Sequence, residues 1–119
     1  MFLEHAISFS IPEACAFLPR THTYTHSVVF GRRILDASPA HIRRTFDVNL
    51  VANFWTVRAF LPAMLRSSKG GHIVTVSSVC AFAGFHSLAD YCASKWGSFA
   101  FAEALRQEID AEQMNMQVL

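Results

Sequence analysis

Tyr91 and Lys95 lie four residues apart in a stretch whose pattern predicts a helix, so they share one face, a turn apart. A phenol, with an ordinary pKa of about 10, is a poor proton carrier at neutral pH. A cation held beside a phenol favours the phenolate and makes it a usable acid or base. Lys95 is one of only two lysines in the chain and is flanked by small and apolar residues. The pair is therefore a candidate for proton transfer.

Ser78 lies thirteen residues before Tyr91, directly after the segment 72–77 (HIVTVS). This segment is short and rich in β-branched residues, which predicts a buried parallel strand. The carboxyl end of such a strand opens onto the crevice where α/β sheets bind ligands. A hydroxyl there could donate a hydrogen bond to a carbonyl oxygen that gains negative charge during hydride transfer.

The elements around these residues predict an α/β protein. Ser38 and Pro39 form a helix start signal. Apolar residues at three- and four-residue spacing then predict one long helix over 39–66, or two in tandem with a kink near Asn49. A second long helix is expected over 88–112, and a further strand begins at 115–119. The order predicts a partial doubly wound, Rossmann-like parallel sheet with two long helices, incomplete at its edges.

Composition excludes several functional classes. The net charge is +1 with no basic run longer than two residues, so nucleic-acid binding has no support. Three cysteines without CxxC spacing argue against a disulfide framework or a metal site and favour a reducing, cytoplasmic compartment. The longest apolar segment, 50–65, is interrupted by Arg58 and Pro62, and we expect no transmembrane span. Residues 1–26 lack a clear period and are expected to form an irregular or disordered arm.

A tyrosine and lysine at this spacing are common by chance, but the whole pattern is much more specific. It comprises Asp47-Val48-Asn49, then Gly71–Ser78, then Tyr91-Cys92-Ala93-Ser94-Lys95. Over residues 27–119 the chain resembles the short-chain dehydrogenase/reductase family. That family has a Val-Asn pair on a long helix, a strand that ends in serines, and Tyr-x-x-x-Lys thirteen residues later.

The resemblance implies a role for each matching residue. Tyr91 resembles the general acid/base, and Ser78 resembles the hydroxyl that orients the substrate carbonyl. Lys95 resembles the lysine that lowers the pKa of the catalytic tyrosine, and Tyr91 and Lys95 would both contact the cofactor, NAD or NADP. Asn49 resembles the helix asparagine whose backbone helps to hold a proton-relay water, although it could also be a polar residue tolerated at a helix kink.

Segments 54–62 and 90–95 most resemble the retinol and 17β-hydroxysteroid dehydrogenase branch of the family. This implies a lipophilic, retinoid- or steroid-like alcohol as substrate. It also implies the surface of the endoplasmic reticulum or of lipid droplets as an alternative to the cytoplasm.

The part of the family pattern that grips the dinucleotide is missing. None of the five glycines forms a TGxxxGxG pattern, whose backbone lets a pyrophosphate approach a helix N-terminus. We therefore expect a truncated or alternatively spliced product, in which the strand 72–77 lacks its sheet neighbours. Two hypotheses follow. The chain is an NAD(P)-dependent oxidoreductase by family, or an inactive fragment that pairs with a second copy or a full-length subunit through helices 39–66 and 88–112.

Overall fold

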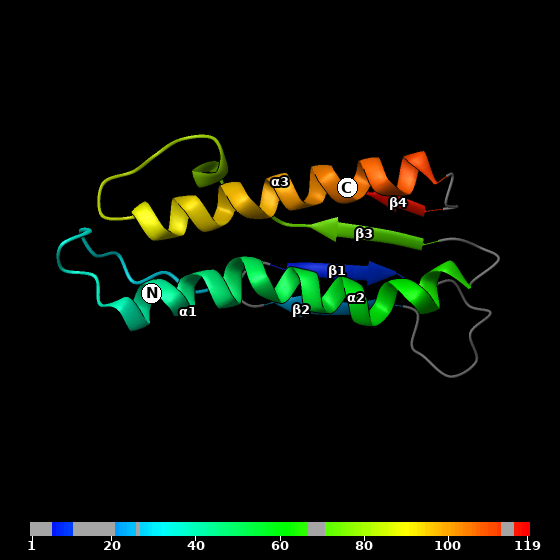
Figure 1. Cartoon of the computed structure of the whole chain (residues 1–119), viewed down its shortest axis with the longest axis horizontal. Helices are drawn as coiled ribbons and strands as arrows, with labels where there is room; N and C mark the ends of the chain where they lie inside the picture. The colour runs from blue at the N-terminus through cyan, green and yellow to red at the C-terminus, as the bar shows by residue number, and fades with distance from the viewer. Residues whose placement is uncertain (1–5, 11–20, 26, 67–70, 113–115) are drawn as a thin grey trace.

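The computed structural model describes residues 6–10, 21–25, 27–66, 71–112 and 116–119, with the backbone alone for the first two segments. The elements in chain order are β1 (Ala6–Ser10), β2 (Thr21–Thr25), α1 (Pro39–Phe46), η1 (Asp47–Val51), α2 (Ala52–Leu65), β3 (Gly71–Thr75), η2 (Val79–Ala81), α3 (Ala89–Ala111) and β4 (Met116–Val118). Figure 1 shows α1 and α2 in line with one another and beside α3, with the strands behind the helices.

The first long helix begins where the sequence predicts. The Ser38 side chain caps it by accepting a hydrogen bond from the backbone N–H of His41 at 3.2 Å, and Pro39 occupies the first turn. At the expected kink near Asn49 the helix contains one π-helical segment, η1, which joins α1 to α2 without a break. The Ala52 N–H accordingly bonds the carbonyl of Asp47, five residues earlier. Short π-helical segments such as η1 bend helices and occur often at functional sites.

The sheet confirms the α/β class and adds strands that the sequence pattern did not predict. Its order is β2-β1-β3-β4, and β3 and β4 are parallel with Ile73 opposite Val118. β1 pairs antiparallel with both β2 and β3. The expectation of a purely parallel sheet is therefore correct for β3 and β4 only.

The expected irregular arm over residues 1–26 is wrong for the ten residues of β1 and β2. The segment Thr-His-Thr-Tyr-Thr of β2 is rich in β-branched and aromatic residues, which suit a strand. The expectation that β3 lacks sheet neighbours is also wrong, because β1 pairs along one of its edges. A strand edge exposes unpaired N–H and C=O groups that readily recruit another strand. The division of the chain at residue 27 stays a prediction.

The hydrophobic core lies between the two long helices and the parallel strand pair. Its buried members come from α2, β3, α3 and β4: Val57, Met64, Ile73, Leu105, Ile109, Met116 and Val118. Each large apolar side chain buried in this way stabilises the fold by about 1.5–3 kcal/mol. The core thereby fixes β3 against α3, and so fixes the strand end that carries Ser78 relative to the helix that carries Tyr91 and Lys95.

The helix over Pro39–Leu65 is long and apolar enough to cross a membrane by length and composition alone. A helix packed in a protein interior meets the same criteria. In this helix Asn49 and Asn53 are buried and hydrogen-bonded to α3.

Candidate active site

Tyr91 and Lys95 lie in the first two turns of α3, and both are buried. The exposed fraction is 4% for Tyr91 and 3% for Lys95. The Lys95 Nζ lies 5.7 Å from the centroid of the Tyr91 ring. The four-residue spacing therefore brings the cation and the phenol together on one face of α3, as expected. At this distance the ammonium makes a favourable cation–π contact with the ring.

Burial lowers the pKa of the Lys95 ammonium from its ordinary value of 10.5, and the nearby Cys80 thiol opposes this shift. Within the residues that the structure describes, no carboxylate forms an ion pair with this ammonium. A buried cation without a carboxylate partner is costly to the fold. Perturbed groups of this kind concentrate at functional sites.

Ser78 lies at the N-terminus of η2, three residues beyond the end of β3. Its backbone is extended, with φ −152° and ψ 159°, and its Oγ accepts a hydrogen bond from the Cys80 N–H at 3.2 Å. A hydroxyl also carries one donor, and among the described residues the Ser78 hydroxyl donates to no partner, so its hydrogen could bond a substrate oxygen.

The end of β3 is tied directly to the helix of Tyr91 and Lys95. The Ser77 Oγ donates to the backbone carbonyl of Lys95 at 3.4 Å. Next along the chain, η2 packs against α3, where Cys80 joins Tyr91 and Cys92 in a buried cluster. The structure thus brings the segment that carries Ser78 against the helix turn that carries Tyr91. The convergence of the Ser78, Tyr91 and Lys95 polar atoms on one substrate stays a prediction.

Asn49 occupies the π-helical segment and is 4% exposed. Its Oδ1 accepts from the Val28 N–H at 2.8 Å, and its Nδ2 donates to the Val28 carbonyl at 2.9 Å and to the Ser94 Oγ at 3.1 Å. The side chain therefore joins three segments: the stretch before α1, η1 and α3.

The backbone carbonyl of Asn49 also makes two contacts. It accepts from the Ser98 Oγ at 2.6 Å and from the Asn53 Nδ2 at 3.3 Å. A carbonyl oxygen has two lone pairs, and both are used here. The expected relay role, in which the Asn49 backbone helps to hold a water, stays a prediction.

Four buried polar residues form a hydrogen-bonded seam that was not predicted from the sequence: Asn49, Asn53, Ser94 and Ser98. All four residues are buried and hydrogen-bonded to one another across η1, α2 and α3. A signal was present, because the asparagines are four residues apart on one helix and the serines are four apart on the other. Each pair therefore shares one face.

Gly97 permits the close approach of α3 to η1. A Cβ at this position would lie 2.7 Å from the Leu50 Cδ2, closer than real Cβ atoms come to a neighbour. At the start of α3, the Thr45 Oγ1 lies 2.9 Å from the Asp90 Oδ2 and so ties α1 to the turn that precedes Tyr91. Gly97 and these hydrogen bonds together fix the position of α3 against α1 and η1.

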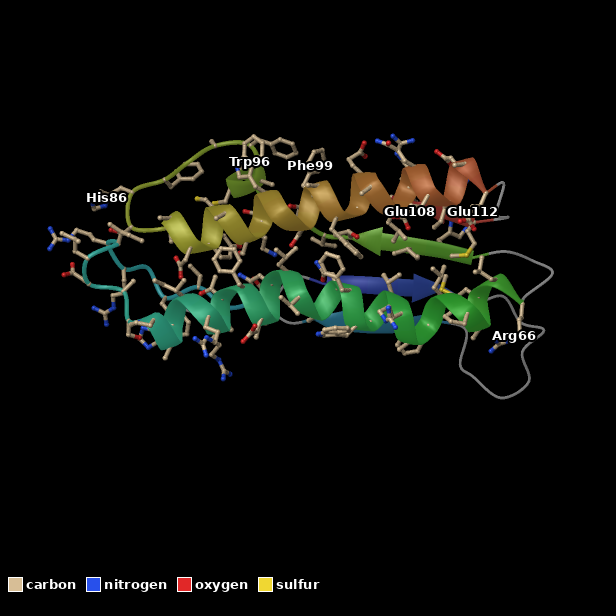
Figure 2. All side chains as sticks on the ribbon, in the orientation of Figure 1. Arg66, His86, Trp96, Phe99, Glu108 and Glu112 are labelled. Carbon is tan, nitrogen blue, oxygen red and sulfur yellow. The ribbon has the colours of Figure 1, made fainter. Side chains whose placement is uncertain are left out.

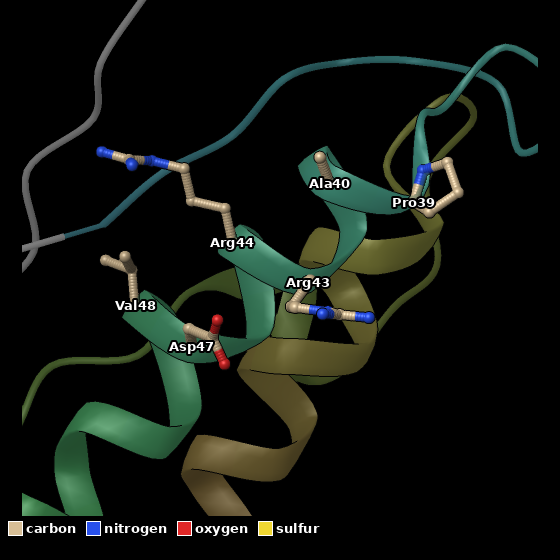
Figure 3. Close-up of a pocket in the computed structure, with 6 residues that line it drawn as sticks. All are labelled: Pro39, Ala40, Arg43, Arg44, Asp47 and Val48. Carbon is tan, nitrogen blue, oxygen red and sulfur yellow. The ribbon is translucent and has the colours of Figure 1, made fainter.

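A surface pocket on α1 does not contribute to this site. Pro39, Ala40, Arg43, Arg44, Asp47 and Val48 line it. Figure 3 shows the Arg43 and Arg44 side chains directed to opposite sides of the helix, so the two guanidinium groups do not converge on one anion. A second groove, with a volume of about 340 Å³, runs between α2 and α3 and is bordered by Phe54, Leu61 and Phe101.

Comparison with known proteins places this arrangement in context. The short chain dehydrogenase family model matches residues 29–119. Short-chain dehydrogenase/reductase family 16C member 6 of Bos taurus is 45% identical over 82 residues, which cover 69% of this chain and 26% of that protein. Human epidermal retinol dehydrogenase 2 is 45% identical over 78 residues, covering 66% of this chain and 25% of the relative. Mouse 17-beta-hydroxysteroid dehydrogenase 13 is 42% identical over 82 residues, which cover 69% of this chain and 27% of that protein.

Solved structures share the fold. A metagenomic short-chain oxidoreductase in complex with NADP superposes with a TM-score of 0.69 at 33% identity, covering 78% of this chain and 41% of that one. LigO from Sphingobium sp. strain SYK-6, in its apo form, superposes with a TM-score of 0.71 at 27% identity. The match covers 79% of this chain and 35% of LigO. The chain spans about a quarter of the length of the curated relatives that it matches.

Proposed function

Because this chain belongs to the short-chain dehydrogenase family, we propose that it carries the half of a hydroxyl/carbonyl oxidoreductase that handles the substrate oxygen. By family it is an NAD(P)-dependent oxidoreductase with a Rossmann-like fold. The observation that best supports the proposal is the buried Lys95 ammonium beside the Tyr91 ring, on the helix against which the Ser78 segment packs.

Each residue has one part in the proposed reaction. The Tyr91 hydroxyl exchanges a proton with the substrate oxygen, giving it up during carbonyl reduction and taking it during alcohol oxidation. The free hydrogen of the Ser78 hydroxyl bonds the same oxygen and stabilises the charge that develops there. The Lys95 ammonium stabilises a phenolate on Tyr91 electrostatically. Asn49 positions η1 against α3 through its bonds to Val28 and Ser94.

The residues present fit the nicotinamide end of a dinucleotide. Lys95 has an ammonium without a carboxylate partner among the described residues, and this group could donate to ribose hydroxyls. The nicotinamide, when bound, supplies or accepts the hydride. For the pyrophosphate we propose that the chain itself has no cradle, because none of its five glycines forms the family's glycine-rich turn.

The substrate class that we propose is a lipophilic alcohol or its carbonyl counterpart. Two relatives with more than 40% identity are named as retinol and 17-beta-hydroxysteroid dehydrogenases. Such substrates partition into membranes and lipid droplets. We therefore propose the surface of the endoplasmic reticulum or of a lipid droplet as the alternative to a cytoplasmic location.

A chimera tests this proposal in a complete protein. Residues 29–119 replace the matching segment of human epidermal retinol dehydrogenase 2, and the oxidation of retinol is followed by cofactor absorbance. Tyr91→Phe should lower kcat by about a hundred- to ten-thousand-fold, because the ring still packs but the proton has no carrier. Binding of NAD(P)H, followed by fluorescence, should change little. A Tyr91→Phe chimera with normal turnover would refute the proposed role.

Exposed aromatic residues favour a second function, pairing with another copy or with a full-length subunit. Phe54 and Trp55 on α2 are 45% and 63% exposed, and Trp96 on α3 is 49% exposed. Figure 2 shows Trp96 and Phe99 projecting from α3 on the side away from α2. Apolar surface of this kind marks interaction sites.

Sedimentation measures this second function directly. The chain should sediment as a dimer at micromolar concentration, and Trp55→Ser should shift it to monomer. Leu35→Ser is the matched control, because Leu35 is 94% exposed but lies outside both helices. A monomeric wild-type chain, or equal effects of the two substitutions, would exclude pairing through α2.

A further inference from the structure

Two buried cysteines pack beside Tyr91 in one cluster. Cys80 lies in η2 and Cys92 lies in the first turn of α3, and they are 6% and 7% exposed. They belong to one buried cluster together with Tyr91. Burial raises the pKa of the Cys92 thiol, and the Cys80 side chain adds to this shift.

Neither thiol takes part in the proposed reaction. The sequence alone predicts that both are small packing residues, because Cys80 has no histidine near it in the sequence and a reactive Cys92 would need its own base or cationic pocket. The fold changes this interpretation. It brings together two free cysteines that are twelve positions apart in the chain, from a short helix and a long one.

We propose that Cys80 and Cys92 form a reversible dithiol/disulfide pair, a modification site that reacts with small disulfide oxidants of the glutathione class. One cysteine thiolate attacks a sulfur of glutathione disulfide and releases one glutathione thiol. The other cysteine thiolate then attacks the mixed disulfide and releases the second glutathione. The two cysteines together lose two electrons and two protons, and glutathione disulfide is reduced to two thiols.

The Cys80–Cys92 disulfide would connect the segment that carries Ser78 to the helix that carries Tyr91. Cys80 is two residues after Ser78, and Cys92 directly follows Tyr91. The covalent link closes the segment 80–92, so η2 and the loop after it can no longer separate from α3. This proposal rests on the positions of the thiols and not on the proposed enzymatic function.

Burial raises the pKa of the Cys92 thiol above its ordinary value of 9.0. Because the thiolate is the reacting form, its fraction keeps increasing with pH up to that raised value. The step in which the Cys92 thiolate attacks should therefore still be accelerating at pH 9. A rate that levels off well below pH 9 would show that Cys92 does not limit the reaction.

The test uses the full chain carrying Cys15→Ser, so that only the pair remains. The chain is equilibrated in glutathione buffers of graded ratio, quenched in acid, alkylated and analysed by peptide mass spectrometry. We expect a Cys80–Cys92 cross-linked peptide, about 2 Da lighter than the sum of the two thiol forms. The same chain in denaturing urea should need at least a tenfold more oxidising ratio to reach half closure.

Three results would overturn the proposal: thiols that stay reduced, separate glutathione adducts on each cysteine, or equal closure with and without urea. Cys80→Ser and Cys92→Ser are the matched variants, and each should carry one glutathione adduct in place of the cross-link. The comparison with urea alters neither member of the pair, so it remains decisive even where a serine variant fails to fold.

Discussion

At the scale of single residues, the buried Lys95 ammonium is the strongest evidence for the candidate site. Burial disfavours its charged form, so the folded chain binds this proton less tightly than the unfolded chain does. The unfolded state therefore binds more protons between the lowered pKa and the ordinary value of 10.5. In that interval Lys95 makes the free energy of unfolding increase with pH.

Lys95→Met should remove this increase. The methionine fills a similar volume without a charge to desolvate. The free energy of unfolding of the variant should therefore exceed that of the wild type most at pH values below the lowered pKa of Lys95, and least near pH 10.5. Cys92 titrates with the opposite sign, because its pKa is raised in the fold, and the difference between the two proteins cancels its contribution. Urea unfolding at several pH values measures the effect. A difference that is constant with pH would show that the ammonium is not desolvated.

At the scale of elements, the seam between η1 and α3 determines how the site is built. Asn49→Ala would leave the Val28 N–H and carbonyl without their partner in a buried position. Each such group costs about 1–3 kcal/mol, so we expect a loss of at least that size in the free energy of unfolding.

Thr56→Ala is the matched control for this loss. Among the residues that the structure describes, the Thr56 hydroxyl bonds only the Ala52 carbonyl of its own helix, at 2.7 Å, and joins no second element. Thermal and urea unfolding should show a small change for Thr56→Ala and a large one for Asn49→Ala. Equal losses would mean that the seam does not hold the helices together.

The sequence predicts the helices and β3 well because local signals define them. Ser38 caps, Pro39 fits the first turn, and the pattern of residues 72–77 marks a strand that the structure places at Gly71–Thr75. The antiparallel strands β1 and β2 were not foreseen, because their pairing depends on the open edge of β3 and not on their own periodicity. The Cys80–Cys92 contact escaped notice for the same reason, since it depends on how η2 packs against α3.

At the scale of the whole molecule, we propose that the chain has the residues that would bind the nicotinamide end of the cofactor but no glycine-rich turn for its phosphates. Calorimetric titration of the chain with NADH or NADPH should therefore show no saturable binding at micromolar cofactor. Saturable binding at that concentration would mean that other backbone groups hold the pyrophosphate, and would favour an enzyme that is competent without further segments.

The central claim is that Ser78 and Tyr91 act as one unit on one substrate oxygen. A double-mutant cycle in the chimera with residues 29–119 tests it most directly. Groups that act together are strongly non-additive, so Ser78→Ala with Tyr91→Phe should lower kcat little more than Tyr91→Phe alone. If the two losses simply multiply, or if Tyr91→Phe turns over at the rate of the unsubstituted chimera, these residues are not the catalytic unit proposed here.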